Sequence, residues 1–277
     1  NAPFVIVKGA VEAVREYGFG VILVGDRDRI NQELSRHSYP KEKIDIVHAG
    51  EVIEMEESPA ISVRRKKDSS INVAVNLLKS KTADALVSAG NTGAVACSAV
   101  MTLGLLEGIE RPGIAVMMPT LNDASLLIDV GANIDPKPEH LYQYAIMGTI
   151  YLSHILNRTK PKVGLLNIGE EETKGTEFLK ETYKLLQSAK FNFIGNVEGK
   201  DIFTGKSDVI VCDGLIGNVV LKVSESLAET INKLLRRELK NNFITKLGAF
   251  LSASAFSALK KKIDYSEYGG APLLGID

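Results

Sequence analysis

Short runs of β-branched and other apolar residues alternate with longer amphipathic segments through most of this 277-residue chain. The helical spacing of apolar residues over 4–17 gives way to Val21–Val24, a continuous apolar run, and this order recurs downstream. Such alternation predicts an α/β fold with three α/β/α layers, in which a mainly parallel, doubly wound sheet is covered on both faces. Proteins of this class bind ligands at the carboxyl ends of their strands.

The same patterns predict the domain organisation and the residue ranges of the individual helices and strands. No internal repeat or low-complexity linker marks a boundary, so the sequence predicts a single domain over 1–277. Two consecutive helical patterns without a strand between them predict a helical hairpin insertion at about 219–262. We expect strands at 21–24, 44–47, 83–87, 114–118, 126–130, 163–167, 193–197 and 209–212, and helices at 4–17, 28–35, 71–79, 92–105, 139–156, 176–188 and 219–239.

Charge and cysteine usage narrow the classes of function. The net charge of -1 argues against a protein that coats nucleic acid, which needs a basic face. Cys97 and Cys212 lie far apart inside apolar runs, so we expect reduced thiols and a cytoplasmic protein. There is no leader pattern, and no uncharged apolar run approaches the roughly 18 residues that a membrane span requires.

Polar and glycine residues follow four of the predicted strands. After the first, Ser88, Gly90, Asn91, Thr92 and Gly93 form a small-residue turn that leads into a helix. Glycines allow backbone N–H groups to approach an anion, and a helix N-terminus supplies partial positive charge. The turn is therefore either a phosphate-binding loop or an ordinary helix cap.

The other three turns carry further candidates. Asp129 and Asn133 flank a tight turn, where they orient a ligand or simply shape the turn. Four polar clusters at separate strand ends favour one ligand site over four unrelated caps. The remaining candidates are Glu171 and Lys174 in the third turn and Asp213, Gly217 and Asn218 in the fourth.

Several tempting motifs are absent. No Gly-x-Gly-x-x-Gly follows a strand, and the segment from Gly199 to Ser207 has the wrong spacing for a nucleotide-binding P-loop. The histidines and cysteines lack metal-ligand spacing, so we expect no metal and no cofactor. No nucleophile elbow occurs, which gives a covalent acyl-enzyme little support.

Seven segments in order resemble the bacterial phosphate acyltransferases of phospholipid synthesis. The resemblance runs through nearly the whole chain. The pattern of that family begins with a strand ahead of Asn1 and continues into another strand past Asp277, so we expect both strands to be missing here. The segments are SAGNTGA at 88–94, GIERP at 108–112, DVGAN at 129–133, LLNIGEEETKG at 165–175, GNVEG at 195–199, 208–219 and 268–275.

The resemblance implies transfer of a fatty acyl group from acyl-acyl carrier protein to inorganic phosphate, giving an acyl phosphate for phosphatidic acid synthesis. It also implies a scaffold akin to phosphotransacetylases and isopropylmalate dehydrogenases, and a homodimer. Because a thioester is already activated, phosphate itself can attack it, and the protein must supply hydrogen-bond donors. We expect Lys174 to place charge beside the phosphate or the oxyanion, and Asn218 to donate to the carbonyl oxygen.

Residues 243–262 form a markedly apolar helical pattern with a basic end. It suits a subunit contact or a reversible, peripheral contact with the inner face of the membrane, where the product is used. Two other functions remain open. One is a dehydrogenase of the isopropylmalate type, and the other is an acyl-carrier-binding module without catalysis.

Overall fold

The chain forms two compact units in a computed structural model that describes residues 2–121, 123–263 and 270–277. The N-terminal unit comprises Asn1–Leu106 with Ile276–Asp277, and the C-terminal unit comprises Glu107–Gly275. Each unit has its own apolar clusters, as described below. The prediction of a single domain over 1–277 stays a prediction.

The N-terminal unit contains a two-stranded parallel sheet and five helices. Strands β1 (Val21–Gly25) and β2 (Ile44–His48) pair in register from Val21 with Ile44. One apolar cluster packs helix α1 against β1 and α2 through Val7, Val11 and Leu23. The helices are α1 (Phe4–Tyr17), α2 (Arg27–Leu34), α3 (Pro59–Arg65), α4 (Ser70–Lys79) and α5 (Thr92–Thr102), with a 3-10 turn η1 (Lys41–Lys43).

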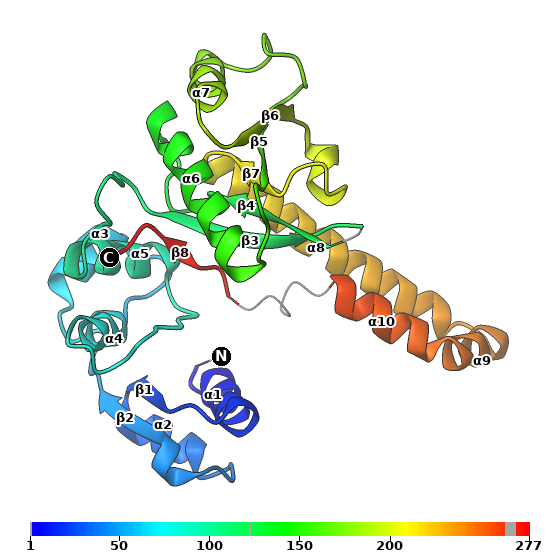
Figure 1. The fold of residues 1–277 in the computed structure, drawn as a ribbon. Coiled ribbons are helices and arrows are strands. Elements are labelled where there is room, and N and C mark those ends of the chain that lie inside the picture. Colours follow the sequence, from blue (N-terminus) through cyan, green and yellow to red (C-terminus); the bar gives the residue numbers. More distant parts are fainter. Residues whose placement is uncertain (1, 122, 264–269) are drawn as a thin grey trace. The chain divides into compact units, whose positions relative to one another are not determined.

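The C-terminal unit is built on a six-stranded sheet (Figure 1). Its strand order is β6-β5-β7-β4-β3-β8, and the four strands from β6 to β4 are parallel. The antiparallel strands β3 and β8 complete the sheet. The strands are β3 (Gly113–Pro119), β4 (Ala124–Ile128), β5 (Lys162–Leu166), β6 (Asn192–Val197), β7 (Val209–Val211) and β8 (Leu273–Leu274).

Alternate residues of the central strands pack on opposite faces of this sheet. In β4, Leu126 and Ile128 join the cluster that includes residues of α6 (Pro138–Ile155) and α7 (Glu177–Gln187). Leu127 joins the opposite cluster, where the start of α8 (Gly214–Leu239) and the 3-10 turn η2 (Gly199–Phe203) pack. Helices therefore cover both faces, and the predicted three-layer, mainly parallel α/β class is confirmed.

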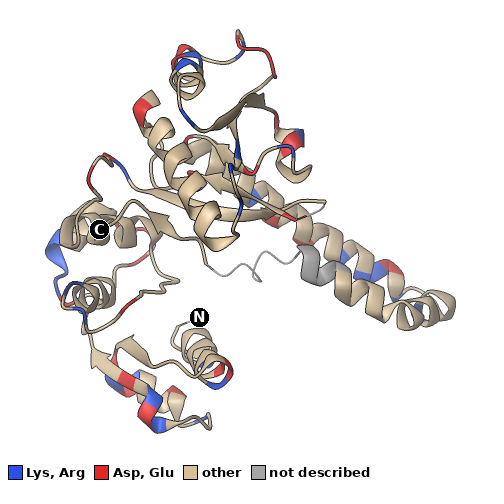
Figure 2. Ribbon diagram, viewed as in Figure 1, with Lys and Arg blue, Asp and Glu red and all other residues tan. Residues whose placement is uncertain are grey.

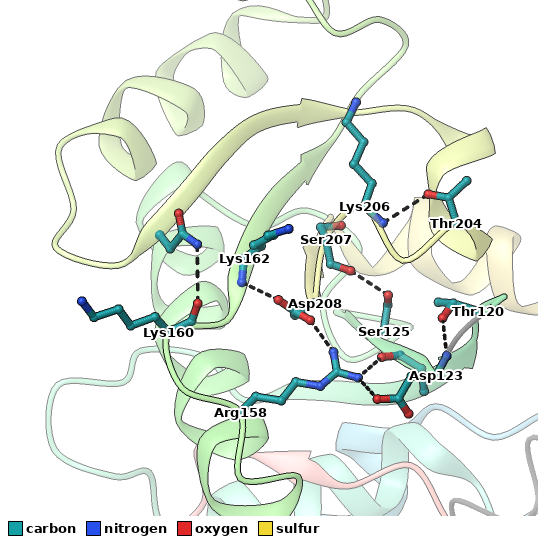
Figure 3. Close-up of polar contacts among 12 residues, drawn as sticks. Thr120, Asp123, Ser125, Arg158, Lys160, Lys162, Thr204, Lys206, Ser207 and Asp208 are labelled. Atoms are coloured by element: carbon teal, nitrogen blue, oxygen red, sulfur yellow. Dashed lines mark hydrogen bonds and ion pairs between the residues drawn. The ribbon is translucent and has the colours of Figure 1, made fainter.

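Ion pairs close the amino edge of the sheet (Figure 3). The Arg158 guanidinium pairs with the carboxylates of Asp208 and Asp123, and it donates to the carbonyl oxygen of Ala124 at 2.9 Å. The backbone N–H of Lys162 donates to Asp208 at 2.7 Å. These contacts tie together the starts of β4, β5 and β7. A ligand-binding role for this edge gains no support.

Most predicted elements are confirmed to within a few residues, but the strand at 83–87 is wrong. The structure describes no strand there, and the Val87 side chain is 93% exposed. Apolar sequence alone does not make a strand, because a strand also needs a neighbour for its backbone groups. Helix α3 and strand β8 were not predicted; both are short, and α3 begins with Pro59.

Three consecutive helices follow β7. Helix α8 (Gly214–Leu239) extends away from the sheet, and it contacts α9 (Phe243–Leu251), which contacts α10 (Ala253–Ile263) (Figure 1). No strand interrupts this stretch in the described chain. A hairpin insertion at about 219–262 stays a prediction. The side chains of Leu259 to Lys262 lie outside the described residues, as do Tyr268 and Gly269 of the family segment at 268–275.

Candidate functional site

Three of the four predicted polar turns emerge side by side at the carboxyl edge of the six-stranded sheet. The turn after β5 spans 167–175, the turn after β7 spans 212–214, and the turn after β4 spans 129–133. Strand β7 lies between β5 and β4, and all three strands are parallel, so their carboxyl ends are neighbours. Figure 2 shows that the strands themselves carry few charged residues, while the loops carry more of them.

Asp129 shapes the turn after β4. Its carboxylate is fully buried and accepts four backbone hydrogen bonds, at 3.0 Å from Ile114, 3.1 Å from Gly131, 3.0 Å from Ala132 and 2.7 Å from Asn133. Four N–H donors stabilise a buried carboxylate and occupy its lone pairs. This favours the turn-shaping role over direct ligand contact.

Asn133 is also engaged within the protein. Its side-chain Nδ2 donates to the carbonyl oxygen of Pro112 at 2.6 Å and to the hydroxyl of Tyr144 at 2.8 Å. Tyr144 is fully buried, and burial, followed by the charge of Asp129, raises the pKa of its hydroxyl. The phenol therefore stays neutral. Sequence reasoning missed Tyr144, since a lone tyrosine in an amphipathic helix gives no signal beyond core packing.

The turn after β7 is pressed against the turn after β4. Asp213 caps α8 by accepting from the Ile216 N–H at 2.9 Å, and the Gly214 N–H donates to Asn133 O at 2.8 Å. A Cβ atom at Gly217 would lie 1.9 Å from Asp129 O, so only glycine fits there. Within the described residues, the side chain of Asn218 is exposed and makes no hydrogen bond. Asn218 lies close to the turn after β4, since a Cβ atom added at Gly131 would be 3.9 Å from the Asn218 Cγ.

The turn after β5 presents Lys174. Asn167 anchors this turn, because the Asn167 Nδ2 donates to the carbonyl oxygen of Lys174 at 3.1 Å. Gly175, with a φ of 86°, packs next to the Asn167 side chain. A Cβ at Gly169 would lie 3.0 Å from the Lys174 Cγ and 2.9 Å from the Glu171 Oε2, so glycine lets both side chains fold over it.

Neighbouring acids do not neutralise Lys174. Glu170 pairs with Lys206 at 2.9 Å, and Glu172 accepts from the hydroxyl of Tyr183 at 2.8 Å. In the part of the chain that the structure describes, Lys174 is exposed and forms no ion pair. The turn therefore offers a free ammonium group at the carboxyl edge of the sheet.

The fourth turn, 88–93, belongs to the N-terminal unit. Asn91 caps α5: its Oδ1 accepts from the Ala94 N–H at 3.0 Å, and its Nδ2 donates to Glu54 O at 3.1 Å. The Ser88 hydroxyl accepts from the Gly90 N–H at 3.2 Å. The cap alternative therefore accounts for the Asn91 side chain, and a phosphate role for the turn stays a prediction.

Neither cysteine is placed as a nucleophile. Cys212 is buried, and its Sγ lies 3.4 Å from the Asp129 carbonyl oxygen. Burial, and then the charges of Asp213 and Asp129, raises the pKa of this thiol well above its usual value. Burial also raises the pKa of the Cys97 thiol, against a smaller opposite effect of Arg64. Because the thiolate is the attacking form, both thiols are poor nucleophiles.

No group of three or more His, Cys, Asp or Glu side chains in the described parts of the chain is arranged to hold a metal ion. Among those same parts, no helix combines the length and apolarity needed to cross a membrane. Lys174 and Asn218 are two donors at this edge whose side chains have no partner within the described residues.

The fold is that of phosphotransacetylases. A phosphotransacetylase from Streptococcus pyogenes superposes with a TM-score of 0.58 at 18% identity, over 81% of this chain and 78% of that one. A phosphotransacetylase from Staphylococcus aureus gives 0.58 at 15% identity, over 81% of this chain and 79% of that one. At these identities the likeness defines the class of fold and nothing finer.

The chain belongs to the family described as fatty acid synthesis protein, whose model matches residues 1–277. Curated relatives named phosphate acyltransferase are 52% identical in Geotalea uraniireducens and 50% identical in Geobacter sulfurreducens. Each match covers 100% of this chain and 80% of the relative. The chain is therefore an acyltransferase of this family. The predicted resemblance is confirmed, and the dehydrogenase alternative is excluded.

Proposed function

We propose that this enzyme transfers a fatty acyl group from acyl-acyl carrier protein to inorganic phosphate, and that the acyl phosphate product feeds phospholipid synthesis. One observation carries the proposal. Lys174 and Asn218 are free donors on the turns that follow two neighbouring parallel strands, β5 and β7, while Asp129, Asn133 and Asp213 bond within the protein. The names of the relatives support phosphate as the acceptor.

The free donors match the needs of a direct transfer. A phosphate oxygen attacks the thioester carbonyl carbon, the carbonyl π electrons move to oxygen, and a tetrahedral oxyanion forms. The oxyanion then collapses, the carbon–sulfur bond breaks, and the carrier leaves as a thiolate that takes up a proton. Positive charge and N–H donors placed at the developing oxyanion lower this barrier. We assign the charge to Lys174 and the amide donor to Asn218.

The remaining predicted residues support the donors. We propose that Asp129, Asn133, Asp213 and Gly217 hold the two turns in position, and that Glu171 orients Lys174 from the same turn. The buried, protonated state of Cys212 favours direct attack by phosphate over an acyl-cysteine intermediate.

We also propose that the turn 88–93 binds phosphate, for reasons that do not depend on Lys174 or Asn218. Its glycines and helix N-terminus are suited to an anion. No hydrogen bond to the backbone N–H groups of Thr92 and Gly93 is found within the described residues. Ser88, Gly90 and Asn91 are proposed to hold the turn in shape around them.

The test of the function is phosphate-dependent release of carrier thiol from acyl-acyl carrier protein, with acyl phosphate trapped as the hydroxamate. We expect thiol and hydroxamate to appear in equal amounts and only when phosphate is present. Thiol release at the same rate with and without phosphate would indicate a thioesterase and would refute the proposal. Carrier binding without any release would favour the non-catalytic acyl-carrier-binding module.

A further inference from the structure

A second cationic side chain, besides that of Lys174, lies at the same edge of the sheet. Arg111 precedes β3, which runs antiparallel to β4 with Ala115 opposite Ile128. The start of β3 therefore lies beside the carboxyl end of β4. Two hydrogen bonds fix this arrangement: the Ile114 N–H donates to Asp129 Oδ1 at 3.0 Å, and the Val130 N–H donates to Ile114 O at 3.0 Å.

The backbone is pinned on both sides of Arg111. Ahead of it, the Glu110 N–H donates to the Gln143 side chain at 2.9 Å, and the Glu110 carboxylate lies 3.3 Å from the buried His140 imidazole. After it, the Pro112 carbonyl accepts from Asn133 Nδ2 at 2.6 Å. A Cβ at Gly113 would meet a ring carbon of Tyr144 at 3.1 Å, so the chain is also packed tightly there.

The guanidinium itself has no partner in the described chain. Arg111 is exposed and forms no ion pair or side-chain hydrogen bond there. Its charge acts on Tyr144 of α6, the hydroxyl that accepts from Asn133: burial raises the pKa of that hydroxyl, and the positive charge of Arg111 partly opposes the shift. The result is a rigidly placed backbone that presents an unused cation beside the turn formed by Asp129 and Asn133.

We infer that Arg111 binds a phosphate group of the reactants at this edge, an inference that rests on the proposed function. A guanidinium presents parallel N–H donors that match two oxygens of one phosphate, and it stays charged at any working pH. Lysine offers a single point of charge instead. Arg111 thus complements Lys174: the arginine fixes the orientation of the phosphate, and the lysine stabilises charge. The phosphate is either the free acceptor or a phosphate ester carried by the acyl donor.

The experiment compares Arg111→Gln and Arg111→Lys with the wild type, with Arg29→Gln as the control. Arg29 is an exposed arginine of the N-terminal unit that makes no ion pair in the described structure. For each protein, kcat and the KM values for phosphate and for acyl-acyl carrier protein are measured, and melting temperatures check the folding. Calorimetric titration with sodium phosphate measures binding without turnover.

We expect Arg111→Gln to raise one KM by at least about tenfold with an unchanged melting temperature, as loss of a charge-assisted hydrogen bond predicts. A higher KM for phosphate identifies the acceptor as the ligand, and a higher KM for the carrier identifies the donor's phosphate ester. Arg111→Lys should recover part of the loss. Two unchanged KM values, or a fall in kcat that follows a lower melting temperature, would overturn the inference.

The titration separates this inference from the proposed function. If the wild type releases no thiol with phosphate, the proposed function fails by itself. Phosphate binding by the wild type that is lost in Arg111→Gln would then still support the inference. Equal phosphate binding by both proteins, or none by either, would contradict it when both proteins also bind acyl-acyl carrier protein equally well.

Discussion

The two cysteines differ in their surroundings, and that difference is measurable. Cys212 is 2% exposed, and burial raises the pKa of its thiol well above the usual value, while Cys97 is partly exposed with a more modest upward shift. A raised pKa means less thiolate at any given pH, so alkylation of Cys97 should be slow at pH 7 and faster at pH 9. Cys212 should react only after unfolding.

Peptide mass spectrometry after iodoacetamide treatment of the native and the denatured enzyme checks this expectation. Labelling of native Cys212 at the rate of Cys97 would contradict the described burial and would reopen the question of an acyl-cysteine intermediate.

Individual residues also show why the site was only partly predictable. Lys174 and Asn218 were found because they stand among glycines after predicted strands. Asp129 and Asn91 stand in equally polar turns, yet their side chains bond to backbone groups of the protein itself. Sequence gives the residue type at a turn, but the partner that the side chain selects depends on the packed structure.

At the scale of elements, the strand and helix patterns were reliable wherever a neighbour exists to pack against. The run at 209–212 became β7 because β4 and β5 pair with it on both sides. The run at 83–87 pairs with no strand in the described residues; it is neither helix nor strand there, and its Val87 side chain is 93% exposed. The local sequence pattern indicates which secondary structure a segment prefers, but a strand forms only where a neighbouring strand pairs with it.

The close approach of α8 to the turn after β4 gives a prediction for stability. Gly217→Ala places a Cβ 1.9 Å from Asp129 O, so α8 must shift, and we expect a loss of about 2 to 3 kcal/mol in the free energy of unfolding. Gly9→Ala in α1 is the matched control, because nothing lies within 4 Å of its Cβ position. This control should gain about 0.5 to 1 kcal/mol.

Urea unfolding followed by circular dichroism measures both changes. A Gly217→Ala variant as stable as the wild type would show that the two turns are not in contact as described.

At the scale of the whole molecule, α8 leaves a row of apolar side chains uncovered. They recur at intervals of three or four residues along one face and are 47 to 60% exposed; they are Val219, Val223, Leu227, Ile231 and Leu234. We propose that a second copy of the chain covers this row in a homodimer. Leu227→Glu should then shift the mass measured by light scattering from dimer to monomer, while Asn232→Glu should not. A monomeric wild type would refute the proposal.

Helix α9 offers a second apolar surface. Phe243, Ile244, Phe250 and Leu251 are 73 to 81% exposed. We propose reversible membrane contact through about 243–262, because a short apolar helix inserts into the interface without spanning it. Leu251→Glu should reduce flotation with anionic vesicles, whereas Ser252→Glu adds the same charge outside the apolar face and should reduce it less. Equal flotation of both variants and the wild type would remove this idea.

The central claim is that acyl transfer to phosphate takes place at the carboxyl edge of the six-stranded sheet, with Lys174 and Asn218 as donors. The most direct measurement is kcat for phosphate-dependent thiol release by Lys174→Ala and Asn218→Ala, beside Lys184→Ala on the surface of α7 as the control. We predict a loss of about a hundredfold or more in each of the first two variants, with unchanged melting temperatures, and near-normal turnover in the control. Near-normal turnover in both donor variants would contradict the account.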